Sequence, residues 1–231
     1  MFFPILDWTM ILLVPAILLT LYAQMKVKST FNKYSSIASR IGLTGAQVAR
    51  DLLRRNGVPV SVERTPGELT DHYDPRSQVL RLSGPVHDSH SLAALGVAAH
   101  EAGHAMQHEE GYFPLGFRNS LVPVANFGST LSFPLLLIGI FMGSPMLAQL
   151  GVFAFTAVVL FQVITLPVEF NASNRAIRLL TEGGYITQEE VGPTRAVLNA
   201  AALTYVAAAL MAFLNLVRLL ILTGFLSGGD E

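Results

Sequence analysis

The sequence predicts a polytopic α-helical membrane protein with four transmembrane helices and a small α+β domain outside the bilayer. Of its 231 residues, 52% are hydrophobic and only 13% are charged. The mean hydropathy of +0.49 is too high for an ordinary soluble domain. No charged residue occurs between Arg118 and Glu169, or between Arg195 and Arg218. A helix needs about 20 apolar residues to cross a hydrocarbon core of about 30 Å, so these gaps predict membrane spans.

Four spans are expected along the chain. They run over Trp8 to Gln24, Leu121 to Met142, Leu147 to Val168, and Val197 to Val217 with an apolar extension to Leu226. The turn-forming residues 143–145 predict a tight hairpin of the second and third spans. The first span could also be a cleaved signal peptide, but residues 1–7 carry no positive charge, which favours an anchor.

The distribution of lysine and arginine predicts the orientation. Most of the 15 basic residues lie between the first two spans, including Lys26, Lys28, Lys33 and Arg118 near the ends of that segment. Arg175, Arg178 and Arg195 lie between the third and fourth spans, and the remaining basic residue is Arg218. By the positive-inside rule, both charged segments should be in the cytoplasm and both termini outside the cell membrane. The net charge of −1 argues against binding of nucleic acid.

This pattern predicts five parts of the chain. They are an N-terminal anchor (1–25), a cytoplasmic α+β domain (26–120), a transmembrane hairpin (121–168), a cytoplasmic helix (169–196) and a C-terminal transmembrane helix with a short tail (197–231). Within residues 26–120, Thr44 starts a predicted helix that Gly57 ends. Three strands are expected at Val58 to Glu63, Leu69 to Tyr73 and Gln78 to Ser83, forming an antiparallel sheet before a helix from Ser91 to His108.

That last helix carries the most informative motif of the chain, His100-Glu101-Ala102-Gly103-His104. Two imidazoles at positions i and i+4 lie on one helix face about 6 Å apart. Both can therefore reach one metal ion at about 2.0 to 2.1 Å. Glu101 lies between them, where it can take a proton from a bound water. His108 lies about 12 Å along the axis from His100, too far for the same ion.

A hydrolytic zinc site usually has a third protein ligand. Glu169 is the leading candidate because it directly follows the apolar third span and should emerge on the same side of the membrane as the motif. A carboxylate at a membrane boundary needs hydration or a partner, so an ion pair with Arg175 or Arg178 is the structural alternative. The other carboxylates of this segment are expected to be solvated in a polar turn, and they are Glu182, Glu189 and Glu190.

An extended substrate could pair with an exposed sheet edge near the metal. The candidate edge strand is Val79, Leu80, Arg81 and Leu82, and the alternative is an internal strand that pairs only with its neighbours. The group that stabilises the oxyanion is left open among His72, Tyr73, Arg175 and Tyr205.

Several stretches together resemble the YugP-like family of bacterial membrane zinc metallopeptidases. They are residues 69–76, residues 93–99 leading into the histidine motif, Pro167-Val168-Glu169-Phe170-Asn171-Ala172-Ser173, and residues 199–208. More distantly, the chain is similar to the HtpX and CAAX-prenyl-protease type, in which a Glu of an ExxxD pattern completes the site. The resemblance implies a zincin-like domain and a gluzincin-like hydrolase, with one zinc ion per chain on His100, His104 and Glu169. Ser173 stands where that pattern has Asp, so Asn171, Ser173 or Asn174 are the expected orienting residues instead.

Three functional hypotheses follow. The first is a zinc metalloendopeptidase that cleaves membrane-associated or misfolded proteins at the cytoplasmic face, with Glu101 as general base. The second is a non-catalytic membrane scaffold that binds a protein partner and keeps zinc for folding. The third is an intramembrane protease of the site-2 type, which is disfavoured because the later spans contain no Asp. Oligomeric state is not predicted.

Overall fold

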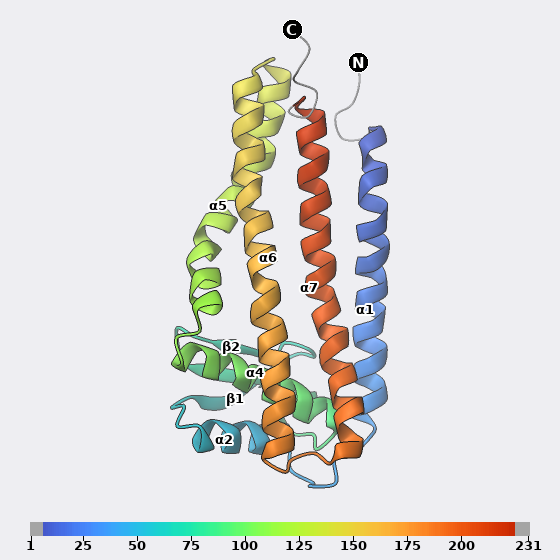
Figure 1. Ribbon diagram of the computed structural model, residues 1–231, viewed down its shortest axis with the longest axis vertical. Helices are drawn as coiled ribbons and strands as arrows, with labels where there is room; N and C mark the ends of the chain where they lie inside the picture. Colours follow the sequence, from blue (N-terminus) through green and yellow to red (C-terminus); the bar gives the residue numbers. More distant parts are fainter. Residues whose placement is uncertain (1–6, 225–231) are drawn as a thin grey trace. The chain divides into compact units, whose positions relative to one another are not determined.

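The computed structural model describes residues 7–224, which are mostly helical with one small sheet (Figure 1). The elements in chain order are η1 (Trp8–Leu13), α1 (Val14–Ser35), α2 (Gly45–Arg55), β1 (Ser61–Thr65), β2 (His72–Asp74), β3 (Val79–Ser83), α3 (Gly84–His87), α4 (Leu92–Glu109), α5 (Phe113–Phe141), α6 (Pro145–Glu182) and α7 (Gln188–Leu222). They form two compact units. The hairpin unit contains residues 7–22, 117–166 and 204–224, and the sheet unit contains residues 23–116 and 167–203.

Four helical segments of the described chain are long and apolar enough to cross a membrane. They are Trp8–Ser35, Phe113–Phe141, Pro145–Glu182 and Gln188–Leu222. Each corresponds to one predicted span, although the second helix ends one residue before the predicted Met142. The last helix continues to Leu222 within the predicted extension, of which residues 225 and 226 lie outside the described part of the chain. Only 11 to 28% of their most apolar windows is buried within the protein. Large side chains such as Phe141 and Phe153 are about four-fifths exposed. Such apolar exteriors are compatible with lipid rather than water.

The hairpin unit owes its tight packing to small residues. A turn follows α5 at the predicted position, where the Ser144 N–H donates to the Gly139 carbonyl at 2.8 Å. On α6, a Cβ atom at Gly151 would lie 2.7 Å from the Ser132 carbonyl oxygen of α5. Only glycine permits this approach, which is a common way for membrane helices to pack closely.

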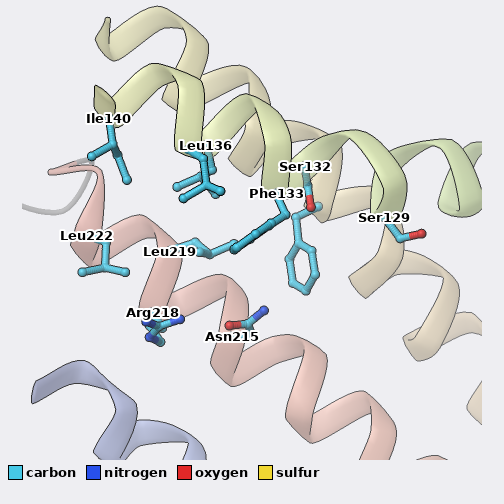
Figure 2. A pocket seen from close by; sticks show the side chains of 11 residues that line it. Ser129, Ser132, Phe133, Leu136, Ile140, Asn215, Arg218, Leu219 and Leu222 are labelled. Atoms are coloured by element: carbon cyan, nitrogen blue, oxygen red, sulfur yellow. The ribbon is translucent and has the colours of Figure 1, made fainter. Parts of the chain in front are cut away.

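A partly buried ion pair joins the start of the described chain to α7. The Arg218 guanidinium donates to Asp7 at 2.8 Å and to the Thr9 hydroxyl at 3.2 Å. Next to it, a cavity of about 310 Å³ lies between α5 and α7, with Ser132, Asn215 and Arg218 among its polar lining (Figure 2). The described lining residues include no histidine and no carboxylate. The cavity therefore lacks the groups that acid–base chemistry needs.

In the sheet unit, α2 forms as its sequence predicts. Thr44 is the N-cap and forms a capping box with Gln47. The Thr44 hydroxyl accepts the backbone N–H of Gln47, and the Gln47 side chain accepts the backbone N–H of Thr44. The apolar face buries Val48, Leu52 and Leu53 almost completely. Gly57 follows the last turn with a positive φ, as a C-terminal stop requires.

The three strands form a mixed sheet, so the predicted antiparallel sheet is wrong. β1 pairs with β3 in parallel, and β2 pairs with β3 antiparallel in the order β1-β3-β2. The short turn at residues 75–78 dictates the antiparallel β2 and β3 pair. The chain between β1 and β3 is long enough to cross over, which a parallel pair requires. Residue periodicity carries no information about this order.

β3 is the central strand, so the predicted exposed edge at Val79, Leu80, Arg81 and Leu82 is also wrong. Its neighbours cover both edges, and four of its five residues are buried. Arg81 forms ion pairs with Glu63 on one side and Asp74 on the other. Hydrogen bonds from Ser77, the Arg76 N–H and Arg81 lower the pKa of Asp74 well below its usual range.

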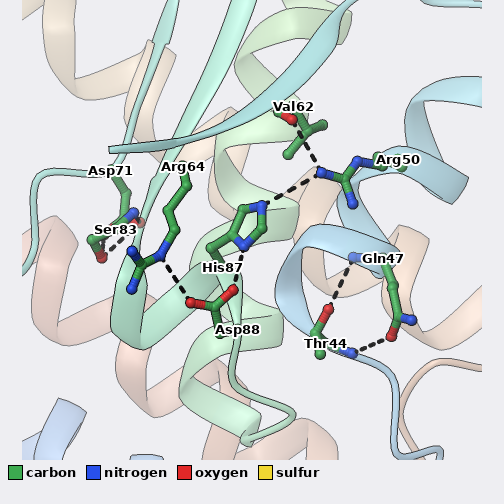
Figure 3. A network of polar contacts seen from close by, with 9 residues as sticks. All are labelled: Thr44, Gln47, Arg50, Val62, Arg64, Asp71, Ser83, His87 and Asp88. Atoms are coloured by element: carbon green, nitrogen blue, oxygen red, sulfur yellow. Dashed lines mark hydrogen bonds and ion pairs between the residues drawn. The ribbon is translucent and has the colours of Figure 1, made fainter. Parts of the chain in front are cut away.

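A polar network ties α2, β1 and α3 together (Figure 3). Arg50 donates to the Val62 carbonyl at 3.1 Å and lies 3.4 Å from His87 Nε2. Asp88 contacts His87 Nδ1 at 2.6 Å and Arg64 at 2.9 Å. His87 thus belongs to the framework of the unit.

Glu182 and Glu189 are exposed as expected, whereas the expectation that Glu190 is solvated is wrong. Glu190 is buried, and its carboxylate accepts the N–H groups of Arg40 at 2.9 Å and Thr187 at 2.7 Å. Glu189 pairs with Arg40. The fold uses these carboxylates to join the start of α7 to the loop before α2.

Candidate metal centre

Helix α4 carries the histidine motif and is tightly packed. Its N-cap is Ser91, whose hydroxyl accepts the Ala94 N–H at 3.2 Å. Several alanines of α4 are buried and belong to the main hydrophobic core. Gly103 faces α6, where an added Cβ would lie 3.1 Å from the Ala172 carbonyl oxygen. The small residue therefore allows the two helices to approach at the motif.

This approach brings three potential ligands together. Glu169 Oε2 lies 3.3 Å from His100 Nε2 and 3.6 Å from His104 Nε2. The three ligand atoms all lie within 4.8 Å of one another. Glu169 is 3% exposed and His104 is 9% exposed. The residues singled out from the sequence thus meet in one buried cluster.

Hydrogen bonds at Nδ1 orient both imidazoles. The Ser173 hydroxyl lies 3.1 Å from His100 Nδ1, and Gln107 Oε1 lies 3.0 Å from His104 Nδ1. Both Nε2 atoms are therefore the ones directed at Glu169. A free Nε2 lone pair is what a histidine ligand offers to a metal.

The donor set fits a zinc ion. A tetrahedral ion with ligand distances of about 2.0 to 2.1 Å holds its ligand atoms about 3.3 to 3.4 Å apart. The distances of 3.3 and 3.6 Å from Glu169 to the imidazoles are close to this value. Two imidazoles and one carboxylate are one of the ligand sets that hold catalytic zinc.

The electrostatics of the cluster favour a positive charge between the ligands. Burial lowers the pKa of His104, but the hydrogen bond to Glu169 and the charges of Glu101 and Glu169 outweigh it, so the pKa is raised above its ordinary value of 6.5. Close by, burial is the main cause that raises the pKa of Asp71, and the charge of Glu101 adds to it. The negative charges of Glu101 and Glu169 therefore stabilise the protonated form of His104.

Glu101 is held by the neighbouring strand. The backbone N–H of Tyr73 in β2 donates to its carboxylate at 3.0 Å. The Tyr73 hydroxyl lies 2.7 Å from His108 Nδ1 on the last turn of α4. Tyr73 thus contacts both the carboxylate inside the motif and the histidine that follows it.

The other candidates from the sequence have different surroundings. His72 is exposed, and its Nδ1 lies 2.8 Å from the Thr70 carbonyl. Arg175 donates to Asn171 at 2.7 Å and to Glu110 at 2.7 Å. Asn171 contacts Gln107 rather than an imidazole, and Asn174 is exposed. Tyr205 belongs to the hairpin unit, so its role stays a prediction.

Sequence reasoning missed Gln107. It lies one turn after His104 on the same helix face, and it is completely buried. The signal that could have identified it is its position, since it is a polar residue three positions after a candidate ligand in a helix rich in small apolar residues. The contact of His108 with Tyr73 had no such signal, because the pairing depends on where β2 lies.

Comparisons with known proteins identify the family of the chain. Residues 9–224 match the family model described as "Putative neutral zinc metallopeptidase". The chain is 48% identical over 221 residues to the "Putative membrane protease YugP" of Bacillus subtilis strain 168, covering 95% of this chain and 97% of that protein. No solved structure matches the chain significantly.

Proposed function

The chain belongs to the neutral zinc metallopeptidase family, and from this we propose that it is a membrane-embedded zinc metalloendopeptidase with His100, His104 and Glu169 as zinc ligands. The observation that carries the proposal is the buried cluster of two imidazoles and one carboxylate beside Glu101. The proposed substrates are membrane-associated or misfolded proteins, cleaved at the cytoplasmic face.

The chemistry divides between the ion and the chain. Zinc supplies a Lewis acid that lowers the pKa of a bound water to about 7 and polarises the scissile carbonyl. Glu101 is the general base, since it follows His100 directly on α4 and its charge acts on His104. Its carboxylate takes a proton during attack and returns it to the leaving amine. The hydrogen bond from the Tyr73 N–H holds this carboxylate in place.

We propose that an extended substrate pairs with the edge of β2, because β3 is the central strand. β2 is an edge strand, and the N–H of Tyr73 points away from β3 toward Glu101. An extended peptide that pairs with this edge would pass beside the general base. The oxyanion donor stays open among His72, Tyr73, Arg175 and Tyr205, because the Tyr73 N–H is engaged with Glu101, its hydroxyl contacts His108 and Arg175 is engaged with Glu110.

The intramembrane alternative finds no support in the fold. Helix α4 is not among the described helices that are long and apolar enough to span a membrane. The third ligand candidate is a glutamate on α6, not an aspartate of a later span. We therefore place cleavage outside the hydrophobic core of the substrate.

The decisive experiment compares the purified parent chain with Glu101→Gln. The Gln side chain cannot accept a proton, so turnover should fall by about 100-fold or more while bound zinc remains at the parent level. Metal content and cleavage of an unfolded protein substrate are measured on the same preparations. Equal cleavage rates for the two proteins would exclude Glu101 as the base. An unchanged cellular phenotype of Glu101→Gln would favour the zinc-stabilised scaffold instead.

A further inference from the structure

We infer that Gln107 is a positioning residue of the metal site, which keeps the proton of His104 on Nδ1 and its Nε2 lone pair toward Glu169. The inference rests on the proposed zinc site. Ser173, which stands where the ExxxD pattern has Asp, contacts His100, and the inference assigns the corresponding role at His104 to Gln107. The evidence is a chain of buried hydrogen bonds whose directions can be determined.

The direction of each bond follows from groups that have only one role. The Val168 carbonyl can only accept, so the Gln107 atom 3.0 Å from it is the amide nitrogen. The same nitrogen lies 2.9 Å from Asn171 Oδ1, which also accepts from Arg175 Nε, a group that can only donate. Gln107 Oε1 must then face His104 Nδ1 at 3.0 Å, and this ring nitrogen carries the proton.

The position of Gln107 couples both ligand-bearing helices. Its side chain is 0% exposed, so water does not compete for its hydrogen bonds. It contacts an imidazole ligand on α4 and the carbonyl of Val168, which directly precedes the ligand Glu169 on α6. One side chain therefore holds the ring plane of one ligand and the backbone next to another.

The first test is Gln107→Leu in the full-length protein in detergent, with zinc affinity measured by competition with a chromophoric chelator. Leu has a similar size but cannot accept the Nδ1 proton of His104. Loss of such an orienting bond typically costs about 10 to 100-fold in metal affinity, and we expect a decrease in this range. Zinc affinity equal to the parent value would overturn the inference.

A second variant separates orientation of the ligand from packing. Gln107→Glu keeps an oxygen for His104 but loses the donor to Val168 and Asn171. Its metal-free form should melt at a lower temperature than the parent, while its zinc affinity stays within roughly a few-fold of the parent, because a carboxylate is the usual acceptor for a ligand histidine. Zinc affinity as weak as in Gln107→Leu would show that the amide acts only through packing.

A third variant covers the case in which Gln107→Glu does not fold. Asn171→Ala removes one acceptor of the Gln107 nitrogen and leaves the bond to His104. It should weaken zinc binding less than Gln107→Leu, and an equal loss would contradict the inference.

Gln47→Leu is the matched control, because it removes a glutamine that caps α2 in the same unit. It should lower the melting temperature without changing zinc affinity, and a loss of affinity as large as in Gln107→Leu would mean that general destabilisation explains both. Cleavage by the parent, measured alongside, tests the proposed function separately. A parent that binds zinc without cleaving would refute the peptidase, whereas the affinity ranking would still decide the role of Gln107.

Discussion

At the scale of single residues, the metal centre depends on a carboxylate that the fold removes from water. Glu169 is 3% exposed, and burying an ionised carboxylate is costly unless charges or donors compensate. Two imidazoles face its Oε2 atom at 3.3 and 3.6 Å. When both rings are neutral, their Nε2 lone pairs also point there. A cation between the three groups removes this conflict.

Replacing the third ligand should separate metal binding from folding. Glu169→Gln keeps the size of the side chain but removes its charge, so zinc affinity should fall more than about 100-fold, beyond the usual cost of an outer hydrogen bond. Metal content after dialysis against a weak chelator measures the effect. The metal-free variant should melt no lower than the metal-free parent, because it no longer buries a charge. Full zinc occupancy would exclude Glu169 as a ligand.

Acid should compete with zinc for the same position. The pKa of His104 is raised, chiefly by the hydrogen bond to Glu169 acting against burial, and zinc binds only the neutral ring. Zinc affinity should therefore be highest at pH values above the raised pKa of His104. It should decrease as the pH falls through that pKa, and the decrease should begin above pH 6.5. Chelator competition between pH 5 and 9 checks this. A constant affinity down to pH 6 would contradict it.

At the scale of elements, the spacing of α4 and α6 decides whether a site forms. The motif supplies two ligands wherever it lies on a helix, but the third arrives only because Gly103 lets Ala172 approach. The continuity of α6 matters as well. Residues 145–182 form one helix across the apolar run and beyond Glu169. Hydropathy marks where the predicted span ends, although the helix continues.

A larger residue at this contact should open the site. In Gly103→Val the added side chain meets the Ala172 backbone, which cannot rotate away, so the variant should lose about 1 to 3 kcal/mol of stability and bind zinc more weakly. Thermal unfolding with and without zinc measures both effects. Gly116→Val is the control, since nothing lies within 4 Å of a Cβ atom at that helical glycine. Equal behaviour of the two variants would show that the close contact is not required.

At the scale of the whole molecule, the chain combines apolar helices whose surfaces are compatible with lipid and a polar unit that carries the candidate metal site. The hairpin unit exposes large apolar side chains, whereas the sheet unit carries most of the charged ones and the metal ligands. The positive-inside rule predicts which side of the membrane the charged segments occupy. The proposal that substrates are cleaved at the cytoplasmic face requires this orientation.

Labelling of single cysteines can test the orientation, because the natural chain has no cysteine. Glu68→Cys lies in an exposed loop before β2, and Met142→Cys lies in the exposed turn after α5. A membrane-impermeant maleimide should label Met142→Cys on intact cells and Glu68→Cys only after permeabilisation. The reverse pattern would place the metal centre outside the cell.

Much of this protein follows from local sequence. The four apolar helices, the capped helix α2 and the spacing of His100, Glu101 and His104 depend on hydropathy, capping and helical periodicity, which neighbouring residues determine. Tertiary structure alone decided that β3 is central and that Gln107 contacts His104. It also brought Ser173 and Glu169, which were candidates from the sequence, into contact with the imidazoles. These features join segments far apart in the chain. Their positions depend on how closely helices and strands pack, and a one-dimensional pattern does not contain that information.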